Sequence, residues 1–513
     1  MMRFVLIAGI VMPTVVLAGS LQFSDHSDTL PLAHVYDGGW EHFVGGGVAV
    51  FDCNGDGYPD FLAAGGENPV RLFVNQTNGA EWKFSDGRFA PVTGVTGAYP
   101  LDVEGDGLVD LMVLRVGANQ IYRGIGDCVF EQVGRDYGFR SDEHWSTAFS
   151  ATWEGDNLLP TLALGNYVDK SDPDGPFEAC DVNQLYRPKN GLYITPVTLS
   201  PGHCALSMLF SDWQRTGKPD LRVSNDRHYY VRNGSEQMWQ MQDLRLLGPG
   251  DGWDPISIWG MGIASQDITG DQRPEVVLTS MGDQLMQIAT PDGFDAAPFS
   301  IGTYAHRPFT GGDGRPSTGW HAEFGDVNND GREDLFIAKG NVDQMPGSAM
   351  KDPNNLLMQG ADGIFVEMAD QAGVATLERS RGAALVDIDR DGLLDLVVVN
   401  RRAPLELYRN ISDATGNWLA ITPRNSGANT FAIGSWIELR DKTGRISTKE
   451  LTIGGGHVGG QLGPIHFGLG ANDTTDVRVI WPDGGVSDWI DVKANQFIAL
   501  WRQDSGKLRI TKD

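Results

Sequence analysis

A nine-residue pattern of acidic residues and glycine recurs along this chain and constrains its fold more than any other feature. Its clearest copy is Asp-Cys-Asn-Gly-Asp-Gly-Tyr-Pro-Asp at residues 52–60. The copy places oxygen-bearing side chains at its first, third, fifth and ninth positions and glycine at its sixth. Such a loop can wrap tightly around a hard cation such as Ca²⁺. We therefore expect a repeat protein whose loops bind calcium.

The spacing of the copies predicts the architecture. Their first positions are residues 52, 102, 152, 212, 267, 326 and 387. Short apolar runs flank each copy, for example residues 47–51 and 395–400, and their length and β-branched residues are typical of strands. A third run ends in asparagine at residues 71–75 and 406–410, and a fourth begins with phenylalanine at residues 130 and 365. Four strands per copy predict a seven-bladed β-propeller.

The ends of the repeat region indicate how the ring closes and where it stops. The seventh copy lacks a fourth strand, and residues 21–25 have the form of that strand. We therefore expect the N-terminal segment to pair into the last blade. The fold class is all-β: a propeller over residues 19–413, followed by a small C-terminal β-rich, sandwich-like domain over residues 414–513.

Four copies carry a complete set of ligands, and the residue at the seventh position of each is expected to contribute its backbone carbonyl. A fifth copy, at residues 267–275, is weaker because Gln272 replaces the sixth-position glycine. We predict four or five bound Ca²⁺ ions. The predicted ligands are Asp52, Asn54, Asp56, Tyr58 and Asp60; Asp102, Glu104, Asp106, Leu108 and Asp110; Asp267, Thr269, Asp271, Arg273 and Glu275; Asp326, Asn328, Asp330, Arg332 and Asp334; and Asp387, Asp389, Asp391, Leu393 and Asp395.

Two copies depart from the pattern. Residues 152–160 have Thr152 and Pro160 at the outer ligand positions, and residues 212–220 keep only two carboxylates. We expect both to be turns without metal. Aspartate, asparagine and glycine are also favoured in ordinary turns, so a single copy alone would not indicate calcium. The twelfth position lies inside an expected strand and carries no glutamate, which excludes an EF-hand.

The N-terminal residues and the cysteines indicate export. Residues 1–18 resemble a cleaved signal peptide, with Arg3, an apolar run and a small-residue cleavage site, although a membrane anchor is the alternative. We expect a bacterial periplasmic or extracellular protein. Export permits disulfides; pairing Cys53 with Cys128 and Cys180 with Cys204 is favoured, and buried free thiols are the alternative. The net charge of −27 argues against nucleic acid or anionic lipid as partners.

The copies resemble the FG-GAP and VCBS repeats of integrin-α-like propellers. Residues 260–267 and 320–326 look like those of the cartilage acidic protein family, and residues 417–421, 454–457, 466–470 and 477–484 resemble its ASPIC/UnbV domain. The resemblance implies a calcium-binding propeller with a small β domain and a role in recognition or adhesion. It implies no catalytic set.

No catalytic or cofactor motif stands out in the sequence. The loop at residues 454–460 lacks the lysine and helix of a phosphate site and is expected to be a flexible turn. Ligand-binding loops are expected opposite the acidic copies, at residues 225–228, 281–283, 341–343 and 400–402. Glycosylation sequons begin at Asn75, Asn233, Asn410 and Asn472.

Three functions remain open. The first is a binding, adhesion or assembly scaffold for a protein or polysaccharide partner. The second is a propeller lyase or hydrolase acting on a polar substrate such as a polysaccharide. The third is a structural subunit of a membrane-associated complex that would reach the membrane only through a partner.

Overall fold

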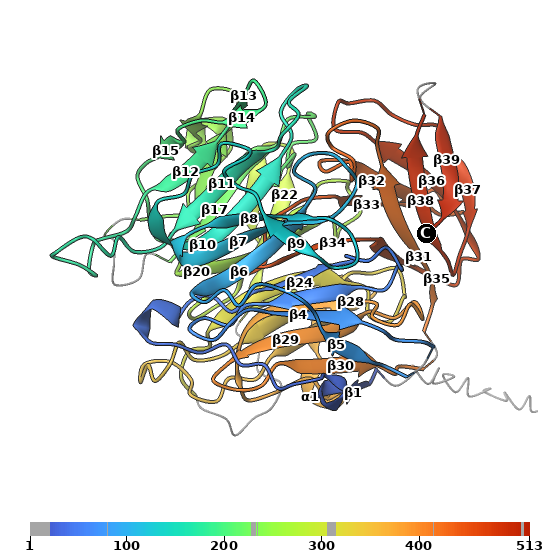
Figure 1. Cartoon of the computed structure of the whole chain (residues 1–513). Helices are drawn as coiled ribbons and strands as arrows, with labels where there is room; N and C mark the ends of the chain where they lie inside the picture. Colours follow the sequence, from blue (N-terminus) through green and yellow to red (C-terminus); the bar gives the residue numbers. More distant parts are fainter. Residues whose placement is uncertain are drawn as a thin grey trace, which may run out of the picture.

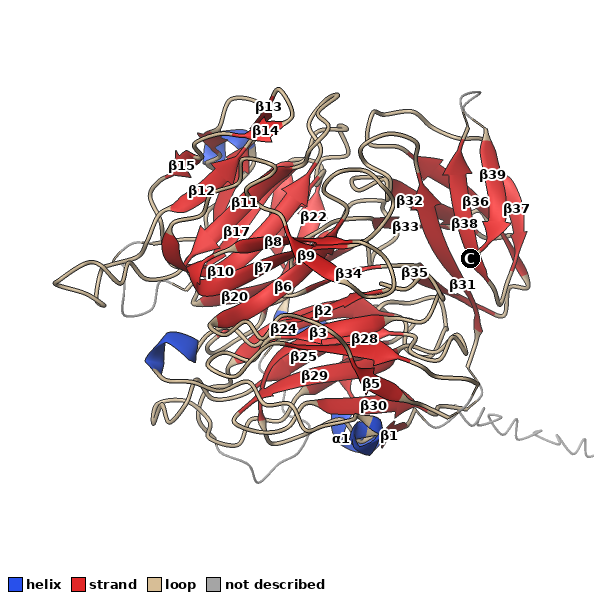
Figure 2. Cartoon of the chain, in the orientation of Figure 1, coloured by secondary structure: helices blue, strands red, loops and turns tan. Residues whose placement is uncertain are grey.

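The computed structural model describes residues 21–513 except residues 80, 227–231, 233, 305–313, 414 and 504–506. The predicted signal peptide therefore lies outside the described residues. Strands dominate the described chain (Figure 2), which confirms the all-β prediction. Its helices are short: α1 (Ala369–Ala372), η1 (Ser27–Thr29), η2 (Trp40–His42), η3 (Pro249–Asp251) and η4 (Phe299–Ile301). None of these described helices has the length and apolar character needed to cross a bilayer.

The described part of residues 21–413 contains antiparallel units of four strands each, which we call blades 1 to 7. Blades 2 and 3 are joined in one eight-stranded sheet, because residues 116–118 also pair with residues 143–145. Blades 1 to 4 are β2 (Val48–Phe51), β3 (Asp60–Ala63), β4 (Arg71–Asn75) and β5 (Phe84–Asp86); β6 (Val95–Leu101), β7 (Asp110–Ala118), β8 (Gln120–Gly124) and β9 (Phe130–Gln132); β10 (Glu143–Thr152), β11 (Thr161–Asn166), β12 (Asn183–Tyr186) and β15 (Val197–Leu199); and β16 (Ala205–Ser211), β17 (Asp220–Asn225), β18 (Gln237–Gln240) and β19 (Arg245–Leu246). Blades 5 to 7 are β20 (Gly260–Gln266), β21 (Glu275–Ser280), β22 (Leu285–Thr290) and β23 (Gly293–Ala296); β24 (Gly319–Gly325), β25 (Asp334–Lys339), β26 (Asn355–Gln359) and β27 (Phe365–Glu367); and β28 (Arg379–Val386), β29 (Asp395–Arg401), β30 (Glu406–Asn410) and β1 (Phe23–Asp25).

The first strand of each blade lies innermost, and neighbouring blades contact one another in cyclic order. β2 contacts β6, and the series continues through β10, β16, β20 and β24 to β28, which contacts β2 again. The predicted closure is confirmed because β1 pairs with β30, placing Phe23 opposite Asn410. These inner strands are almost fully buried. Their β-branched and aromatic side chains fill the space between blades.

The C-terminal residues form two sheets that enclose a core of their own, at the right of Figure 1. One sheet contains β31 (Asn417–Arg424), β35 (Ile465–Gly470), β38 (Phe497–Arg502) and β39 (Leu508–Lys512); the other contains β32 (Trp436–Arg440), β33 (Ile446–Glu450), β36 (Thr474–Ile480) and β37 (Ile490–Lys493). Ile421, Phe467 and Leu500 of the first sheet pack with Ile437 and Val479 of the second. This arrangement agrees with the expected sandwich-like domain.

A segment of the C-terminal domain enters the centre of the ring. We call residues 451–464 the plug. Its strand β34 (Gly460–Leu462) pairs in parallel with β2 of blade 1, and further bridges join the plug to the inner strands of blades 2, 3, 4 and 5. His457 is completely buried. The expected flexible turn at residues 454–460 is therefore wrong, because this loop is packed on most sides by the propeller.

The glycines of the plug permit this close approach. A Cβ atom on Gly459 would lie 2.2 Å from the carbonyl oxygen of Val48, and one on Gly454 would lie 2.5 Å from that of Met208. The ring provides matching glycines, since a Cβ on Gly47 or Gly97 would lie 1.8 Å from the carbonyl of Val458. Glycine here provides space for backbone-to-backbone packing.

Both favoured disulfides are present. Cys53 bonds to Cys128, linking the first turn of blade 1 to the turn between β8 and β9 of blade 2. Cys180 bonds to Cys204 across the long insertion of blade 3. That insertion also contains the small hairpin of β13 (Pro188–Lys189) and β14 (Leu192–Tyr193).

Candidate metal centres

Every copy of the acidic pattern forms the turn between the first two strands of its blade. We call these turns hairpins 1 to 7 and number their positions from 1 to 9. Hairpins 1, 2, 5, 6 and 7 are residues 52–60, 102–110, 267–275, 326–334 and 387–395; hairpins 3 and 4 are residues 152–160 and 212–220.

The carboxylate at position 1 organises each of these five hairpins. In hairpin 1, the backbone N–H groups of Gly55 and Gly57 each donate to Asp52, both at 2.8 Å. The equivalent donors to Asp102, Asp267, Asp326 and Asp387 occur at positions 4 to 6 of their hairpins. The acidic side chain therefore faces into the turn, where a cation would have to bind.

The carboxylate at position 9 is held on both sides by backbone donors. Asp60 accepts the N–H of Cys53 at 2.9 Å and that of Asn75, the last residue of β4, at 2.7 Å. The same two contacts hold the equivalent residues of the other four hairpins, Asp110, Glu275, Asp334 and Asp395. The position-9 ligand is thus fixed by strand geometry before any ion arrives.

Hairpin 5 has the same frame despite Gln272. The N–H of Gln272 donates to Asp267 at 2.9 Å, as the glycine does elsewhere, and Gln272 adopts φ of 72° to do so. The left-handed region costs a side-chain-bearing residue energy that glycine avoids. The missing glycine therefore strains hairpin 5 but does not change its form.

Positions 3, 5 and 7 close the loops. In hairpin 1, the amide of Asn54 donates to Asp56 at 2.9 Å, and the N–H of Tyr58 donates to Asp56 at 2.9 Å. The position-7 residues of the other four hairpins, Leu108, Arg273, Arg332 and Leu393, donate in the same way to Asp106, Asp271, Asp330 and Asp391. Asn328 bridges to Asp330 at 3.2 Å, and Thr269 donates its N–H to Glu275 at 3.3 Å. Their role as calcium ligands remains a prediction.

Burial makes the negative charge of these loops costly. Loss of solvation raises the pKa of Asp60 and Glu275 to about 7, and that of Asp110 and Asp387 to about 8. Neighbouring carboxylates of the same hairpins add repulsion, while backbone donors act in the opposite direction. The same causes raise the pKa values of Asp102, Glu104, Asp326, Asp334 and Asp395. A divalent cation would offset this repulsion.

Hairpin 7 has the most compact set of oxygens. Asp387, Asp389 and Asp395 are buried and offer oxygen atoms that all lie within 4.8 Å of one another. Asp389 also accepts the Trp82 indole N–H at 3.0 Å and lies 2.6 Å from Arg409. With Asp391, this hairpin holds four carboxylates against one nearby guanidinium. The donor set consists of hard oxygens, as Ca²⁺ requires.

Hairpin 3 meets its charge differently. The Arg187 guanidinium donates two hydrogen bonds to Glu154, at 2.7 and 2.8 Å, and the hydroxyl of Thr161 donates to the same carboxylate at 2.6 Å.

In hairpin 4, Asp212 keeps the usual donors from Thr216 and Gly217. However, the Trp213 indole N–H donates to Asp220 at position 9.

The C-terminal domain covers the hairpin side of the ring. The Thr430 hydroxyl donates to Asp102 of hairpin 2, and the Trp418 indole lies against Gly392 of hairpin 7. The His466 Nε2–H donates to Asn329 of hairpin 6 at 2.6 Å. At hairpin 4, Glu450 accepts the Asp212 N–H at 2.8 Å and the Ser211 hydroxyl at 2.6 Å. This contact could not be predicted from the sequence, because it joins segments far apart in the chain.

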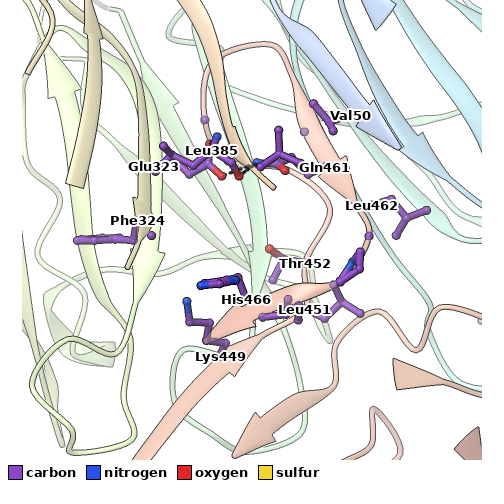
Figure 3. A pocket seen from close by; sticks show the side chains of 18 of the residues that line it. Val50, Glu323, Phe324, Leu385, Lys449, Leu451, Thr452, Gln461, Leu462 and His466 are labelled. Carbon is purple, nitrogen blue, oxygen red and sulfur yellow. Dashed lines mark hydrogen bonds between the residues drawn. The ribbon is translucent and has the colours of Figure 1, made fainter. Parts of the chain in front are cut away.

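A cavity of about 310 Å³ lies between the plug and the inner strands of the ring (Figure 3). Glu323 and Gln461 are hydrogen-bonded on one side of it, and Lys449 and His466 lie on another. His321 Nε2–H donates to Glu323 at 3.2 Å, while its Nδ1 accepts the N–H of His457 at 3.1 Å. Leu385, Leu451 and Leu462 contribute apolar walls. The sequence does not predict this cavity, because the composition of residues 454–460 is that of a flexible turn rather than of a segment packed inside the ring.

In the predicted ligand-binding loops, several polar side chains donate hydrogen bonds to backbone carbonyls and so stabilise the loops. The Asn341 amide donates to Met345 and Ala349 carbonyls, and Asn400 donates to Pro404. Arg401 is buried and donates to the carbonyls of His42 and Gly38. Asn225 is buried, whereas residues 227–228 lie outside the described residues, as does the Asn233 sequon. Residues 281–283 combine buried Met281 with exposed Asp283.

Comparisons with known proteins agree with this architecture. Residues 425–507 match the family model described as ASPIC and UnbV. Residues 52–113 and 326–398 match that of the FG-GAP-like repeat. The second match therefore includes hairpins 1, 2, 6 and 7.

Cartilage acidic protein 1 is a similar curated protein. The Homo sapiens and Mus musculus proteins are each 27% identical to this chain over 162 residues, which is 31% of this chain and 24% and 25% of theirs. The Xenopus tropicalis protein is 31% identical over 111 residues, 21% of this chain and 17% of that protein. The matches thus span a quarter or less of the relatives' length.

Solved structures give weaker similarity. BBS1N in a complex with ARL6DN, soaked with lead, matches with a TM-score of 0.46 and 10% identity, over 77% of this chain and 98% of that one. A mutant of AofleA from Arthrobotrys oligospora has a TM-score of 0.37 and 10% identity, over 68% of this chain and 90% of that one. We draw no functional inference from either. The family matches identify this chain as a protein with FG-GAP-like repeats followed by an ASPIC/UnbV domain.

Proposed function

We propose that this protein is an exported, calcium-stabilised scaffold that binds a protein or polysaccharide partner. The observation that carries the calcium proposal is the shared frame of hairpins 1, 2, 5, 6 and 7, in which buried carboxylates face the same turn. Calcium would be held by the side-chain oxygens of positions 1, 3, 5 and 9 and the carbonyl of position 7. Its chemistry there is to neutralise charge and fix the turn.

The proposed scaffold role is supported by the surfaces that the plug and the C-terminal domain leave open to a partner. The plug and the C-terminal domain occupy the hairpin side and the centre of the ring. A partner would therefore bind to the opposite loops or to the outer edges of the blades. Two disulfides and the predicted signal peptide support export.

Calcium binding can be tested by calorimetric titration of chelator-stripped full-length protein. We expect four or five equivalents to be taken up, and fewer than three would contradict the proposal. Mg²⁺ provides a control, since it demands a smaller octahedral site than these loops would offer. A control protein with Asp52, Asp326 and Asp387 replaced by asparagine should take up correspondingly fewer ions.

The partner can be sought by affinity capture from the native envelope and from culture medium, with and without chelator. Capture of a specific protein or glycan that is lost after chelation would support the scaffold. Chelation that leaves capture unchanged would separate partner binding from the ion sites.

An enzyme acting on a polar substrate such as a polysaccharide is the second candidate, and the cavity is what favours it. Glu323 and His321 form a carboxylate–imidazole pair beside a space large enough for a small ligand. Turnover in a screen of polysaccharides, abolished by Glu323→Gln, would establish a lyase or hydrolase. Activity that survives this substitution would exclude the cavity as its site.

A further inference from the structure

The last strand residues of several blades connect one hairpin to the next. Asn75 ends β4, and its backbone N–H holds Asp60 at position 9 of hairpin 1. Its side-chain amide donates to two carbonyls: Pro59 of the same hairpin at 3.1 Å, and Ile388 of hairpin 7 at 3.0 Å. One asparagine therefore contacts the metal hairpins of two blades.

The same contact recurs in the preceding blades. Asn410 ends β30; its N–H holds Asp395, and its amide donates to Leu394 at 3.1 Å and to Val327 of hairpin 6 at 2.8 Å. Gln359 ends β26; its N–H holds Asp334, and its amide donates to Ile268 of hairpin 5 at 3.2 Å. In each case the accepting carbonyl belongs to position 2 of the neighbouring hairpin.

The position-2 residue links the amide hydrogen bond from the following blade to the position-9 carboxylate of its own hairpin. The N–H of Ile388 donates to Asp395 at 2.8 Å, and that of Val327 donates to Asp334 at 3.1 Å. Each position-2 residue thus touches its own position-9 carboxylate through its N–H and the following blade through its carbonyl. A continuous series of hydrogen bonds joins Glu275, Asp334, Asp395 and Asp60.

Blade 2 joins this series by another route. Gly124 holds Asp110 but has no side chain. The N–H of Cys128 instead donates to the position-2 carbonyl of Cys53 at 3.1 Å, and the disulfide links the same two residues. The hydrogen bonds therefore connect hairpins 5, 6, 7 and 1, which are consecutive around the ring, and the disulfide attaches blade 2 to hairpin 1 through the turn between β8 and β9.

We propose that Asn75, Gln359 and Asn410 are positioning residues that couple the calcium site of each blade to the site of the preceding blade. This inference rests on the proposed calcium binding. An ion bound at one hairpin adds a bond to its position-9 carboxylate, which already holds the backbone N–H of the asparagine or glutamine, and the side-chain amide of that residue holds the position-2 peptide of the neighbouring hairpin. Coupling of this kind is reciprocal, so the sites of hairpins 5, 6, 7 and 1 fill together rather than independently.

The coupling also explains two of the sequons. Asn75 and Asn410 are each only 1% exposed, and both amide groups donate to backbone carbonyls. These asparagines serve the ring and are inaccessible to a glycosyl transferase in the folded protein.

Hydrogen–deuterium exchange during calcium titration of the stripped full-length protein can resolve each hairpin separately. In the unaltered protein, we expect hairpins 5, 6, 7 and 1 to gain protection at a common calcium concentration. In Asn75→Ala, the midpoint of hairpin 7 should rise roughly three- to tenfold, although none of its own ligands has changed. Asn75→Gln should raise the midpoint of hairpin 7 less than Asn75→Ala does, since Gln359 makes the same contact in blade 6.

Asn400→Ala is the matched control, because Asn400 is a buried asparagine of blade 7 whose amide donates to Pro404 away from the hairpins. It should leave all five midpoints in place. If Asn75→Ala does not fold, Asp56→Asn provides the second test: it weakens hairpin 1 at an exposed position and should also shift hairpin 7.

The outcomes separate the two proposals. No protection of any hairpin at any calcium concentration would overturn calcium binding itself. Protection in the unaltered protein, with the hairpin 7 midpoint unmoved in Asn75→Ala or Asp56→Asn, would overturn the coupling alone.

Discussion

Hairpins 7 and 3 occupy equivalent places in the ring and solve the same electrostatic problem in opposite ways. Hairpin 7 brings four carboxylates together, and burial raises the pKa of Asp387 to about 8. Hairpin 3 keeps Glu154 and pairs it with Arg187, which also donates to the Met241 carbonyl of blade 4 at 2.5 Å. In hairpin 3 an arginine of the same blade holds the carboxylate of Glu154, whereas in hairpin 7 Arg409 faces four carboxylates. We propose that an external cation completes the frame of hairpin 7.

Removal of calcium should have the largest effect and should follow this division. We expect the melting temperature to fall on the order of 10 °C, because several sites each contribute free energy to the folded state. Calorimetry with and without EGTA checks the magnitude, and hydrogen exchange checks the location. Exchange should increase in hairpins 5, 6, 7, 1 and 2 first. Equal loosening of hairpins 3 and 4 would break the comparison.

A pH effect is expected at hairpin 4, where no ion is proposed. Burial raises the pKa of Glu450 to about 8 in the folded protein. Between the ordinary pKa of glutamate and about pH 8, the folded protein therefore keeps a proton on Glu450 that the unfolded chain has released. Stability should therefore fall as pH rises between about 4.5 and 8, by roughly 4 to 5 kcal/mol.

Urea unfolding at pH 5.5 and 8 measures this dependence. Glu450→Gln should flatten the profile, whereas Glu143→Gln, at an exposed position, should not. An unchanged profile in Glu450→Gln would show that Glu450 is ionised in the folded protein.

Arg187→Gln tests the internal cation of hairpin 3. We expect a loss of roughly 1 to 2 kcal/mol, since Glu154 would keep its charge without its bidentate partner. The loss should be the same with and without calcium. Arg245→Gln removes a solvent-screened pair with Asp251 and should change stability much less than Arg187→Gln does. If calcium restored the stability of Arg187→Gln, hairpin 3 would be an ion site after all.

Gln272→Gly should produce the smallest change in stability, and it tests whether hairpin 5 belongs with the hairpins proposed to bind an ion. Glycine relieves the left-handed backbone of position 6, which we expect to stabilise calcium-bound hairpin 5 by about 1 kcal/mol or less. Calorimetric titration should show tighter binding of the weakest ion. A weaker or unchanged ion affinity would indicate that Gln272 itself contributes to the site.

Much of the fold could be predicted because the repeat carries local information. The strand order, the pairing of β1 with β30 and both disulfides follow from copies at regular intervals and from their turns. The hydrogen-bond frame of hairpin 5 persists despite Gln272, so the strict glycine requirement underestimated that copy. The signal that marks it is the pair of carboxylates at positions 1 and 9.

The plug, the cavity and the contacts between blades could not be predicted. Glycines at residues 454–460 have the composition of a turn, and only the backbone of β2 and its neighbours shows why side chains are excluded there. Asn75 and Asn410 match a glycosylation motif, and the amide contact that each makes with the neighbouring hairpin involves a residue more than 80 positions away.

The sequence alone determined the β class, the repeating turns and their acidic character, because these depend on residues within a few positions of one another. The tertiary structure decided which hairpins are neighbours, where the C-terminal domain rests and what fills the channel. Those features depend on ring closure, which brings the first and last blades together and lets one segment contact most inner strands at once.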